Sequence, residues 1–210
     1  MKNMETEFKW DANSPRAFMR MLAAVRRAAG KENVSSPRRL KIEDVYLERP
    51  GGEFEKRLIA FRVRNTDGKW EAAFKTRTEV KNGKAVRREE TMPLANIKNL
   101  ADALEFLNAK KRWKVLDITG LRPVFSIRNR RRTAEVFYDG AKAELALDDC
   151  EILVLGRRVC MKEIELELKQ GSAEKMERLA REMTRGSGLE YARVSKVKTA
   201  AALLKLWGNK

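Results

Sequence analysis

Residues 4–10 read Met-Glu-Thr-Glu-Phe-Lys-Trp, and in this stretch charged side chains occupy alternate positions. Successive side chains of a strand point to opposite faces, so Glu5, Glu7 and Lys9 leave one face while the mostly apolar alternates leave the other. The stretch therefore predicts a strand with one charged and one apolar face.

The same alternation returns near the other end of the chain, where Glu163, Glu165, Glu167 and Lys169 alternate with apolar residues. Shorter examples lie between the two: Arg62 with Arg64, Phe74 before Lys75, Arg87 with Glu89, and Glu144 with Asp148. Charge is thus sorted by strand. Alternation alone does not decide whether the charged faces look at solvent or into a closed lumen.

The order of these motifs resembles the CYTH domain family, the triphosphate tunnel metalloenzymes. The N-terminal signature of that family, Glu-x-Glu-x-Lys, is present as Glu5, Glu7 and Lys9. The remaining matches follow in order at Tyr46, Arg62, Arg64, Lys75, Arg87, Glu89, Asp148, residues 163–167, Ser195 and Lys196. The resemblance spans nearly the whole chain, and it rests on the order of the motifs rather than on any one of them.

The resemblance implies an α+β fold: an antiparallel, eight-stranded, closed β-barrel with a polar lumen, covered by amphipathic helices. We expect residues 1–210 to form a single CYTH-like domain. A β-sandwich with its charged faces outward would bury the same apolar residues, so the strand pattern by itself leaves that architecture open.

Composition limits the partners and the chemistry. The chain has 210 residues, 46 Lys and Arg against 30 Asp and Glu, and a net charge of +16, which favours an anionic partner. Histidine is absent, so a catalyst would use lysine, tyrosine, carboxylates or metal-bound water. The two cysteines, Cys150 and Cys160, have no metal-type spacing, and without an export signal or a spanning apolar run we expect a cytoplasmic protein with reduced thiols.

Periodicity places the individual elements. Apolar stripes at helical spacing predict four helices, at 15–30, 96–111, 172–186 and 195–207, the first capped by Asn13 and Ser14. Residues 31–37 read as a loop, and Pro93 is expected to end a strand. Strands, several of them short as in a meander, are predicted at 4–10, 40–47, 58–64, 69–78, 85–92, 115–119, 124–131, 133–138, 142–148, 151–155 and 163–169, with an Asn-Gly turn at 81–84.

Carboxylates on several strands could hold a hard divalent metal such as Mg²⁺ or Mn²⁺, which prefers oxygen ligands. The resemblance implies Glu5, Glu7, Glu165 and Glu167 as the metal residues. Glu163, Asp148 and Glu89 are weaker candidates for metal binding, the first two for a second metal.

Cations on other strands would bind the triphosphate. Arginine suits phosphate oxygens through its planar fork of donors. The substrate residues implied by the resemblance are Lys9, Arg62, Arg64, Lys75, Arg87, Arg131 and Lys196. Arg131 could instead belong to a solvated cluster at residues 128–132, because the register there is not fixed by sequence. Lys9 and Tyr46 are the pair implied to activate water, which would require a lowered lysine pKa.

The sequence departs from the family pattern at Arg128, Thr133 and Thr199, where an acidic residue, a lysine and an arginine are common. The expected activity is metal-dependent hydrolysis of inorganic triphosphate to pyrophosphate and phosphate. Inorganic triphosphate is expected to be preferred over ATP, because no aromatic side chain can be placed beside the charged residues.

Three alternatives stay open at this point: hydrolysis of an organic triphosphate, such as thiamine triphosphate or a nucleotide; cyclisation of ATP; and a basic nucleic-acid-binding barrel. The expected partner is a small triphosphate, with neither a membrane nor nucleic acid expected, and a homodimer is left open.

Overall fold

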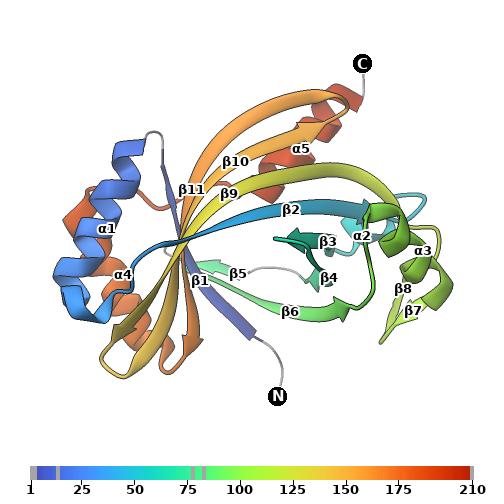
Figure 1. The fold of residues 1–210 in the computed structure, drawn as a ribbon. Coiled ribbons are helices and arrows are strands. Elements are labelled where there is room, and N and C mark those ends of the chain that lie inside the picture. The colour runs from blue at the N-terminus through green and yellow to red at the C-terminus, as the bar shows by residue number, and fades with distance from the viewer. Residues whose placement is uncertain (1–3, 13–14, 77–78, 82–83, 209–210) are drawn as a thin grey trace.

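The chain closes into a barrel, seen in a computed structural model that describes residues 4–12, 15–76, 79–81 and 84–208. Eight antiparallel strands pair in the order β1, β11, β10, β9, β2, β3, β4 and β6, and β6 pairs back onto β1 (Figure 1). The strands of the ring are β1 (Met4–Asp11), β2 (Arg38–Glu48), β3 (Ala60–Thr66), β4 (Lys69–Lys75), β6 (Lys84–Leu94), β9 (Arg122–Tyr138), β10 (Ala141–Val154) and β11 (Arg157–Gln170). The α+β fold and the closed eight-stranded barrel expected from the sequence are therefore confirmed.

Short elements complete the chain. β5 (Glu79–Lys81) pairs with β6 just beyond the stretch that pairs with β4. β7 (Arg112–Trp113) and β8 (Leu116–Asp117) form a separate two-stranded hairpin. The helices are α1 (Pro15–Ala29), a short 3₁₀ helix η1 (Lys31–Asn33), α2 (Glu53–Lys56), α3 (Leu100–Lys110), α4 (Ala173–Ser187) and α5 (Lys196–Gly208).

Strand register turns the charged faces inward. Lys9 lies opposite Glu165 across β1 and β11, while the alternate residue Phe8 lies opposite Leu166. Phe8 and Leu166 are fully buried in an apolar cluster outside the barrel, beneath α1 and α4. The charged residues thus line the lumen, and an outward-facing sandwich does not describe this chain.

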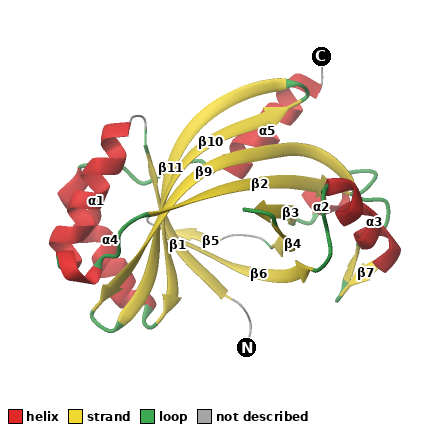
Figure 2. Cartoon of the chain, viewed as in Figure 1, coloured by secondary structure: helices red, strands yellow, loops and turns green. Residues whose placement is uncertain are grey.

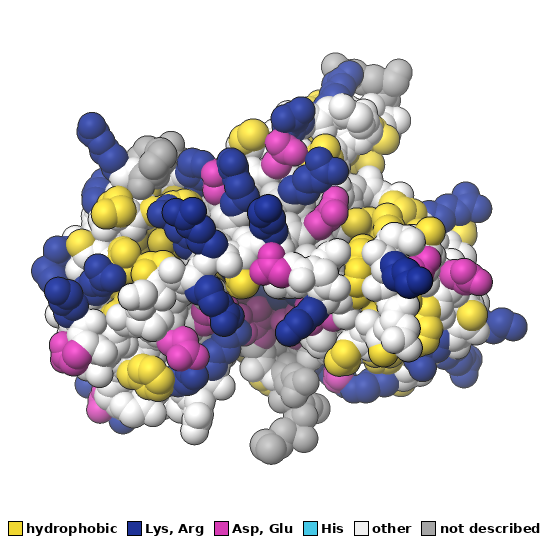
Figure 3. Space-filling view, viewed as in Figure 1, with side chains coloured by type: hydrophobic (Ala, Val, Ile, Leu, Met, Phe, Trp, Pro, Cys, Tyr) yellow, Lys and Arg dark blue, Asp and Glu magenta, His cyan; other side chains and the backbone are white. Residues whose placement is uncertain are grey.

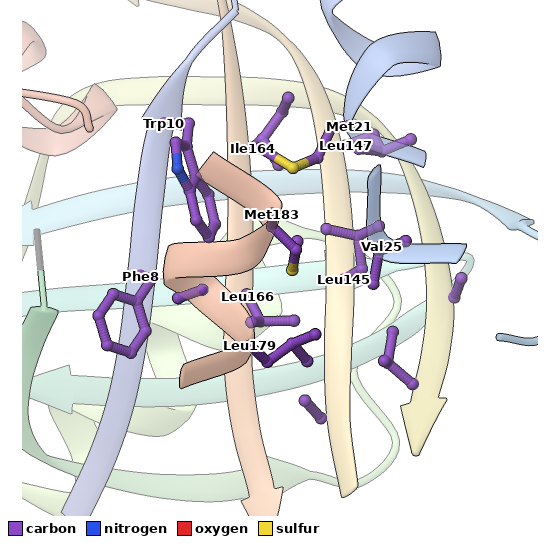
Figure 4. Close-up of a cluster of buried hydrophobic side chains, with 14 of the residues drawn as sticks. Phe8, Trp10, Met21, Val25, Leu145, Leu147, Ile164, Leu166, Leu179 and Met183 are labelled. Atoms are coloured by element: carbon purple, nitrogen blue, oxygen red, sulfur yellow. The ribbon is translucent and has the colours of Figure 1, made fainter. Parts of the chain in front are cut away.

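Helices α1 and α4 pack side by side over one end of the barrel (Figures 1 and 2). Their apolar stripes meet the outward alternates of the strands, and Figure 4 shows Trp10 and Met183 in that cluster. Trp10 also donates a hydrogen bond from Nε1 to Thr184 Oγ1 at 2.8 Å. Each large apolar side chain buried here contributes about 1.5–3 kcal/mol to folding.

A second apolar cluster lies under α2, α3 and the β7–β8 hairpin. Trp113 packs edge-on against Phe61 and Phe74, with ring centroids 5.7 and 5.0 Å away. A third cluster forms where α5 packs against β9 and β10. No helix in the described part of the chain combines the length and the apolar composition needed to cross a bilayer.

Several expected boundaries are wrong. The short strands expected at 124–131 and 133–138 are one 17-residue strand, β9, and those at 142–148 and 151–155 merge into β10. β9 is paired on both sides over residues 126–133, by β2 and β10, so its arginine-rich centre does not interrupt it. The expected meander of short strands is therefore replaced by a few long ones.

The predicted stop at Pro93 is also wrong, because β6 continues to Leu94 and Pro93 pairs with Glu71. β1 pairs only with residues 84–88 of β6, so Pro93 lies where β6 has a neighbour on one side, a position that tolerates proline. Helix α3 begins at Leu100, later than expected, because the Asn99 side chain caps it by accepting from the Asp102 N–H. The predicted cap at Asn13 and Ser14 and the centre of the turn at 81–84 lie outside the described residues.

Candidate active site

A cavity of about 760 Å³ occupies the lumen. Its walls carry Tyr46, every predicted phosphate-binding residue and the four main predicted metal residues. Those residues, with Glu89, are Glu5, Glu7, Lys9, Tyr46, Arg62, Arg64, Lys75, Arg87, Glu89, Arg131, Glu165, Glu167 and Lys196. The weaker metal candidates Asp148 and Glu163 lie beneath this surface and are fully buried.

Carboxylates gather on adjacent strands of the ring, β1, β11 and β10. Glu7 lies opposite Glu167, which lies opposite Glu144 on β10. In a deeper row, Glu163 lies opposite Asp148. We call this side of the lumen the carboxylate wall, and its members are Glu5, Glu7, Glu144, Asp148, Glu163, Glu165 and Glu167.

The deepest part of the carboxylate wall is neutralised by buried cations. Lys196 Nζ donates to Asp148 Oδ2 at 2.6 Å, Glu163 Oε1 at 3.2 Å and Glu165 Oε1 at 2.9 Å. Arg131 makes paired hydrogen bonds to both oxygens of Asp148, each 2.7 Å long. Burial alone would raise the pKa of Asp148, but Arg131 and Lys196 outweigh it and lower that pKa to about 2. Arg131 therefore points into the lumen, which settles the register that the sequence left open.

The opposite side of the lumen is cationic. We call Arg62, Arg64, Lys75 and Arg87, on β3, β4 and β6, the arginine wall. Asp44 on β2 holds it in place, because Arg64 Nε and Nη2 donate to the two Asp44 oxygens at 2.6 and 2.8 Å. Burial would raise the pKa of Asp44, yet Arg62 and Arg64 hold it well below its ordinary value.

Arg87 and Lys75 connect the two walls at Glu5. Arg87 Nε donates to Glu5 Oε2 at 2.6 Å, and Lys75 Nζ lies 3.1 and 3.0 Å from the two Glu5 oxygens. Lys75 also lies 3.1 Å from Glu89 Oε2. Glu89 is thus a counterion of Lys75 and Arg62, and it shares the Lys75 ammonium with Glu5.

Lys9 and Tyr46 lie on strands separated by three others in either direction around the ring, so they face each other across the lumen. Burial lowers the pKa of Lys9, but Glu163, Glu165 and Glu7 outweigh it and raise that pKa well above its ordinary value. The pKa of Tyr46 is also raised above its ordinary value, in this case by burial. The role of Lys9 as a general base, which requires a lowered pKa, finds no support in this arrangement.

The donor set of the carboxylate wall fits a hard divalent metal. All its donors are carboxylate oxygens, and Glu7 Oε1 is buried with no aligned hydrogen bond, although Arg87 Nη2 lies 2.7 Å away. Burial raises the pKa of the adjacent Glu167, whose partner Lys169 is half exposed. Glu7 and Glu167, flanked by Glu5 and Glu144, are the residues that would hold such an ion. Asp148, Glu163 and Glu165 converge within 4.8 Å, but the Lys196 ammonium already contacts all three.

Sequence reasoning missed two features of the site. The sequence did contain a signal for Asp44 as a lumen residue, because Asp44 lies two residues before Tyr46 on the same face of β2. For the apolar residues that line one end of the cavity, such as Phe125 on β9 and Leu204 on α5, no short sequence motif gave a signal.

Among the departures from the family pattern, Arg128 lies outside the barrel against Glu43, and Thr133 is buried with an unpartnered Oγ1.

Comparison with known proteins agrees with this geometry. The CYTH domain model matches residues 3–201, and the chain belongs to that family. No curated protein sequence matches it.

Similar solved structures include HpAC1 from Hippeastrum, described as having a dominant triphosphatase activity, with 17% identity over 94% of this chain and 95% of that one and a TM-score of 0.64. A Pyrococcus horikoshii protein has 19% identity over 95% and 99% of the two chains and a TM-score of 0.62. The Mimivirus capping enzyme triphosphatase has 13% identity over 90% and 91% and a TM-score of 0.53. At these identities the similarity supports the shared fold.

Proposed function

We propose that this protein is a metal-dependent triphosphatase that cleaves inorganic triphosphate to pyrophosphate and phosphate within the barrel. One observation carries the proposal: a wall of carboxylates and a wall of cations face each other across one cavity. Triphosphate needs both, because its oxygens require cationic donors and a bridging hard metal requires oxygen ligands. We further propose Mg²⁺ or Mn²⁺ as the metal, residues 1–210 as one domain and the cytoplasm as its location.

Each group in the lumen then has a chemical role. Arg62, Arg64 and Arg87 bind and orient the phosphate oxygens, and Asp44 keeps the first two extended into the cavity. Lys9 remains an ammonium and adds positive charge beside Glu7, Glu163 and Glu165 of the carboxylate wall. A metal bound at Glu7 and Glu167 would supply further charge stabilisation for the phosphoryl group. Catalysis in this account comes mainly from positioning and electrostatics.

The nucleic-acid alternative has little support in the described residues. Phe137 is the one aromatic ring exposed on a described strand, at 48%, so no row of rings is available for base stacking. On the face drawn in Figure 3, lysines and arginines are spread out and interspersed with acidic side chains. The lumen is nearly charge-balanced, because its lining has ten lysines and arginines against nine glutamates, so the net charge of +16 lies mainly outside it. The argument against nucleic acid therefore depends on the lack of stacking rings in the described strands.

A product assay tests the proposal and separates it from ATP cyclisation. Purified protein is incubated with tripolyphosphate or ATP, with and without Mg²⁺ or Mn²⁺, and phosphate, pyrophosphate and cyclic AMP are measured. We expect metal-dependent release of equal amounts of phosphate and pyrophosphate from tripolyphosphate. Glu7→Gln should remove most of this activity, whereas Glu135→Gln, an exposed glutamate on β9, should not.

Absence of metal-dependent hydrolysis from both substrates would overturn the triphosphatase proposal. Cyclic AMP as the main product from ATP would instead identify the chain as a cyclase.

A further inference from the structure

The outer face of helix α1 is basic and has no counterions of its own. Between Pro15 and Ala29 the helix contains four arginines and no acidic residue. Its apolar stripe is buried against the barrel, whereas Arg16, Arg20 and Arg27 are exposed on the opposite face. In the described part of the chain no carboxylate lies within 4.0 Å of any of these three side chains. Part of the positive charge outside the lumen is therefore carried here without neutralisation.

The neighbouring helix α4 differs from α1 in this respect. Arg181 on α4 lies 3.3 Å from Glu177, one turn away, as is usual on a solvated helix. On α1, by contrast, Arg16 and Arg20 are like charges four residues apart, a spacing at which they repel each other. Arg16 also stands in the first turn, where the helix dipole favours an anion. Both features oppose helix formation, which is unexpected for a face that only contacts water.

The same arrangement continues on the outer face of the adjoining strands. Arg39 on β2 lies directly opposite Arg132 on β9, and Lys41 lies directly opposite Arg130. Like charges at such cross-strand positions disfavour the sheet. Among the described residues, Arg130 is the one of these four with a carboxylate partner, Asp149 at 3.0 Å. Two pairs of like charges are thus retained beside the basic helix.

Arg132 connects the strands to the helix, because its guanidinium carbon lies 5.1 Å from the centre of the Phe18 ring on α1. The cations of the strands and of the helix therefore adjoin each other on the side of the barrel that α1 covers (Figure 1). Along β2 the surface ends at Glu43, which lies 3.2 Å from Arg128. We call it the basic belt, and its members are Arg16, Arg20, Arg27, Arg39, Lys41 and Arg132.

The chemistry of the basic belt argues against a membrane and against a protein partner. A helix that lies in a membrane surface needs an exposed apolar face, but the apolar stripe of α1 is buried. Over residues 16–29, Met19 is the one large apolar side chain that is exposed. Protein interfaces depend on a few apolar or aromatic anchors at their centre, and a single methionine does not supply them.

A single-stranded nucleic acid also fits the basic belt poorly. Its unpaired bases are held by stacking on aromatic rings, and the one ring of α1, Phe18, is only 3% exposed. A duplex makes no such demand, because its bases stack on one another and its phosphate backbone is bound by lysine and arginine. The lack of stacking rings on the described strands therefore does not weigh against a duplex.

We propose that the basic belt binds the phosphate backbone of a double-stranded nucleic acid without regard to base sequence. The α-helical rise places Arg16 and Arg27 about 16 Å apart along α1, and each strand of a duplex carries a phosphate about every 3.4 Å of its axis. Arginine suits this contact because its planar fork of donors matches phosphate oxygens. A bound duplex relieves the repulsion on the helix and on the strands. This binding lies beyond the proposed triphosphatase activity and does not depend on it.

Salt-dependent binding is the first test. Dissociation constants for labelled DNA and RNA duplexes of about 20 base pairs are measured by fluorescence anisotropy between about 50 and 200 mM NaCl. Four to six phosphate contacts predict that the logarithm of the binding constant falls with the logarithm of salt concentration with a slope of about −4 to −5. Absence of binding to both duplexes at the lowest salt concentration would overturn the inference.

Matched double variants show whether the basic belt is the cause. Arg16→Gln with Arg20→Gln removes two cations from the belt, whereas Lys98→Gln with Lys110→Gln removes the same charge beside α3, at the other end of the barrel (Figure 1). The belt variant should bind the duplex about tenfold more weakly, with a salt slope smaller by about 2, while the control stays within about twofold of wild type. Equal losses would mean that net charge alone sets the affinity, and the inference would fail.

A second belt variant keeps the test decisive if the first fails to fold. Arg39→Gln with Lys41→Gln changes two exposed side chains on β2 and should weaken duplex binding in the same way. Tripolyphosphate hydrolysis should be unchanged in all three variants, because none of the substituted residues lines the lumen. Duplex binding and hydrolysis can therefore fail independently of each other.

Three further ligands test the choice of partner. Single-stranded RNA of the same length, inorganic polyphosphate and phosphatidylserine vesicles are measured with wild type and with the belt variants. We expect the belt variants to weaken duplex binding by the largest factor. If they weaken the binding of any other ligand by a larger factor, the basic belt serves a different polyanion and the inference is overturned.

Discussion

The arginine wall and the carboxylate wall of the lumen are neutralised in different ways. On the arginine wall the counterions are cross-strand neighbours: Asp44 lies opposite Arg64, and Glu89 lies opposite Lys75. The carboxylate wall has neighbours of this kind, but its deepest carboxylates also require Lys196, which comes from α5 near the end of the chain. One wall is therefore a property of the sheet, whereas the other also depends on where a helix docks.

The largest expected effect follows from the dependence on α5. Lys196→Met would leave Asp148, Glu163 and Glu165 buried without their shared ammonium. Removing one partner of a buried ion pair costs about 3–5 kcal/mol, because the remaining charge stays desolvated. We expect a loss of this size in the free energy of unfolding, measured by urea denaturation.

The exposed Lys198 on the same helix provides the control. Lys198→Met should change stability by less than about 0.5 kcal/mol, as substitutions at exposed positions usually do. Equal losses in the two variants would mean that α5 is destabilised as a helix and that the buried ion pairs are not the cause.

A smaller effect is expected on the arginine wall. Asp44→Asn removes the charge that pairs with Arg64 and Arg62, and hydrogen bonds to charged groups contribute about 1.5–3 kcal/mol. Arg62 keeps Glu89 at 3.3 Å, which limits the loss. We expect Asp44→Asn to lower the free energy of unfolding by this amount at neutral pH.

The pH dependence gives the Asp44 prediction a second readout. The pKa of Asp44 is lower in the folded protein than its ordinary value of about 3.9, so its contribution is fully present above that value and is lost as pH falls toward the folded pKa. The stability difference between wild type and Asp44→Asn should therefore be constant from pH 7 to pH 5 and shrink at pH 3. A difference that grows at pH 3 would contradict the assignment.

The smallest effect is expected at the rim of the carboxylate wall. Lys169 pairs with Glu167 at 2.8 Å, but its side chain is 40% exposed. Ion pairs at such positions contribute about 0–1 kcal/mol. Lys169→Gln should therefore change the urea midpoint little, and a loss as large as that of Lys196→Met would show that depth in the lumen does not decide the strength of these pairs.

The two walls also differ in how far the sequence predicts them. Alternation in β1 and β11 correctly places Glu5, Glu7, Glu165 and Glu167 on one face of their strands, because strand geometry is a local property. The family resemblance placed that face in the lumen, where these residues line the cavity. The orientation of Arg131 could not be read locally, since a shift of one residue within the arginine run reverses every side chain. Its position follows from pairing with Asp148 on β10.

The apolar part of the cavity lining lies beyond what periodicity can predict. Phe125, Ile59 and Leu204 come from distant parts of the sequence, and each alone reads as an ordinary core residue. They become a surface of the cavity only because α5 docks near the link between α2 and β3. Apart from Lys196 on α5, the charged part of the site is thus encoded strand by strand, and the apolar part by tertiary packing.

One paired experiment tests whether the carboxylate wall binds the metal and the arginine wall binds the phosphates. Mn²⁺ affinity without substrate and KM for tripolyphosphate are determined for Glu167→Gln and Arg62→Gln, with wild type beside them. Glu167→Gln should weaken Mn²⁺ binding about tenfold or more, because it removes a ligand charge. Arg62→Gln should leave Mn²⁺ affinity unchanged and raise KM by a similar factor. If Arg62→Gln weakens Mn²⁺ binding as much as Glu167→Gln does, or if neither variant changes its expected constant, the account of a metal on one wall and phosphates on the other is contradicted.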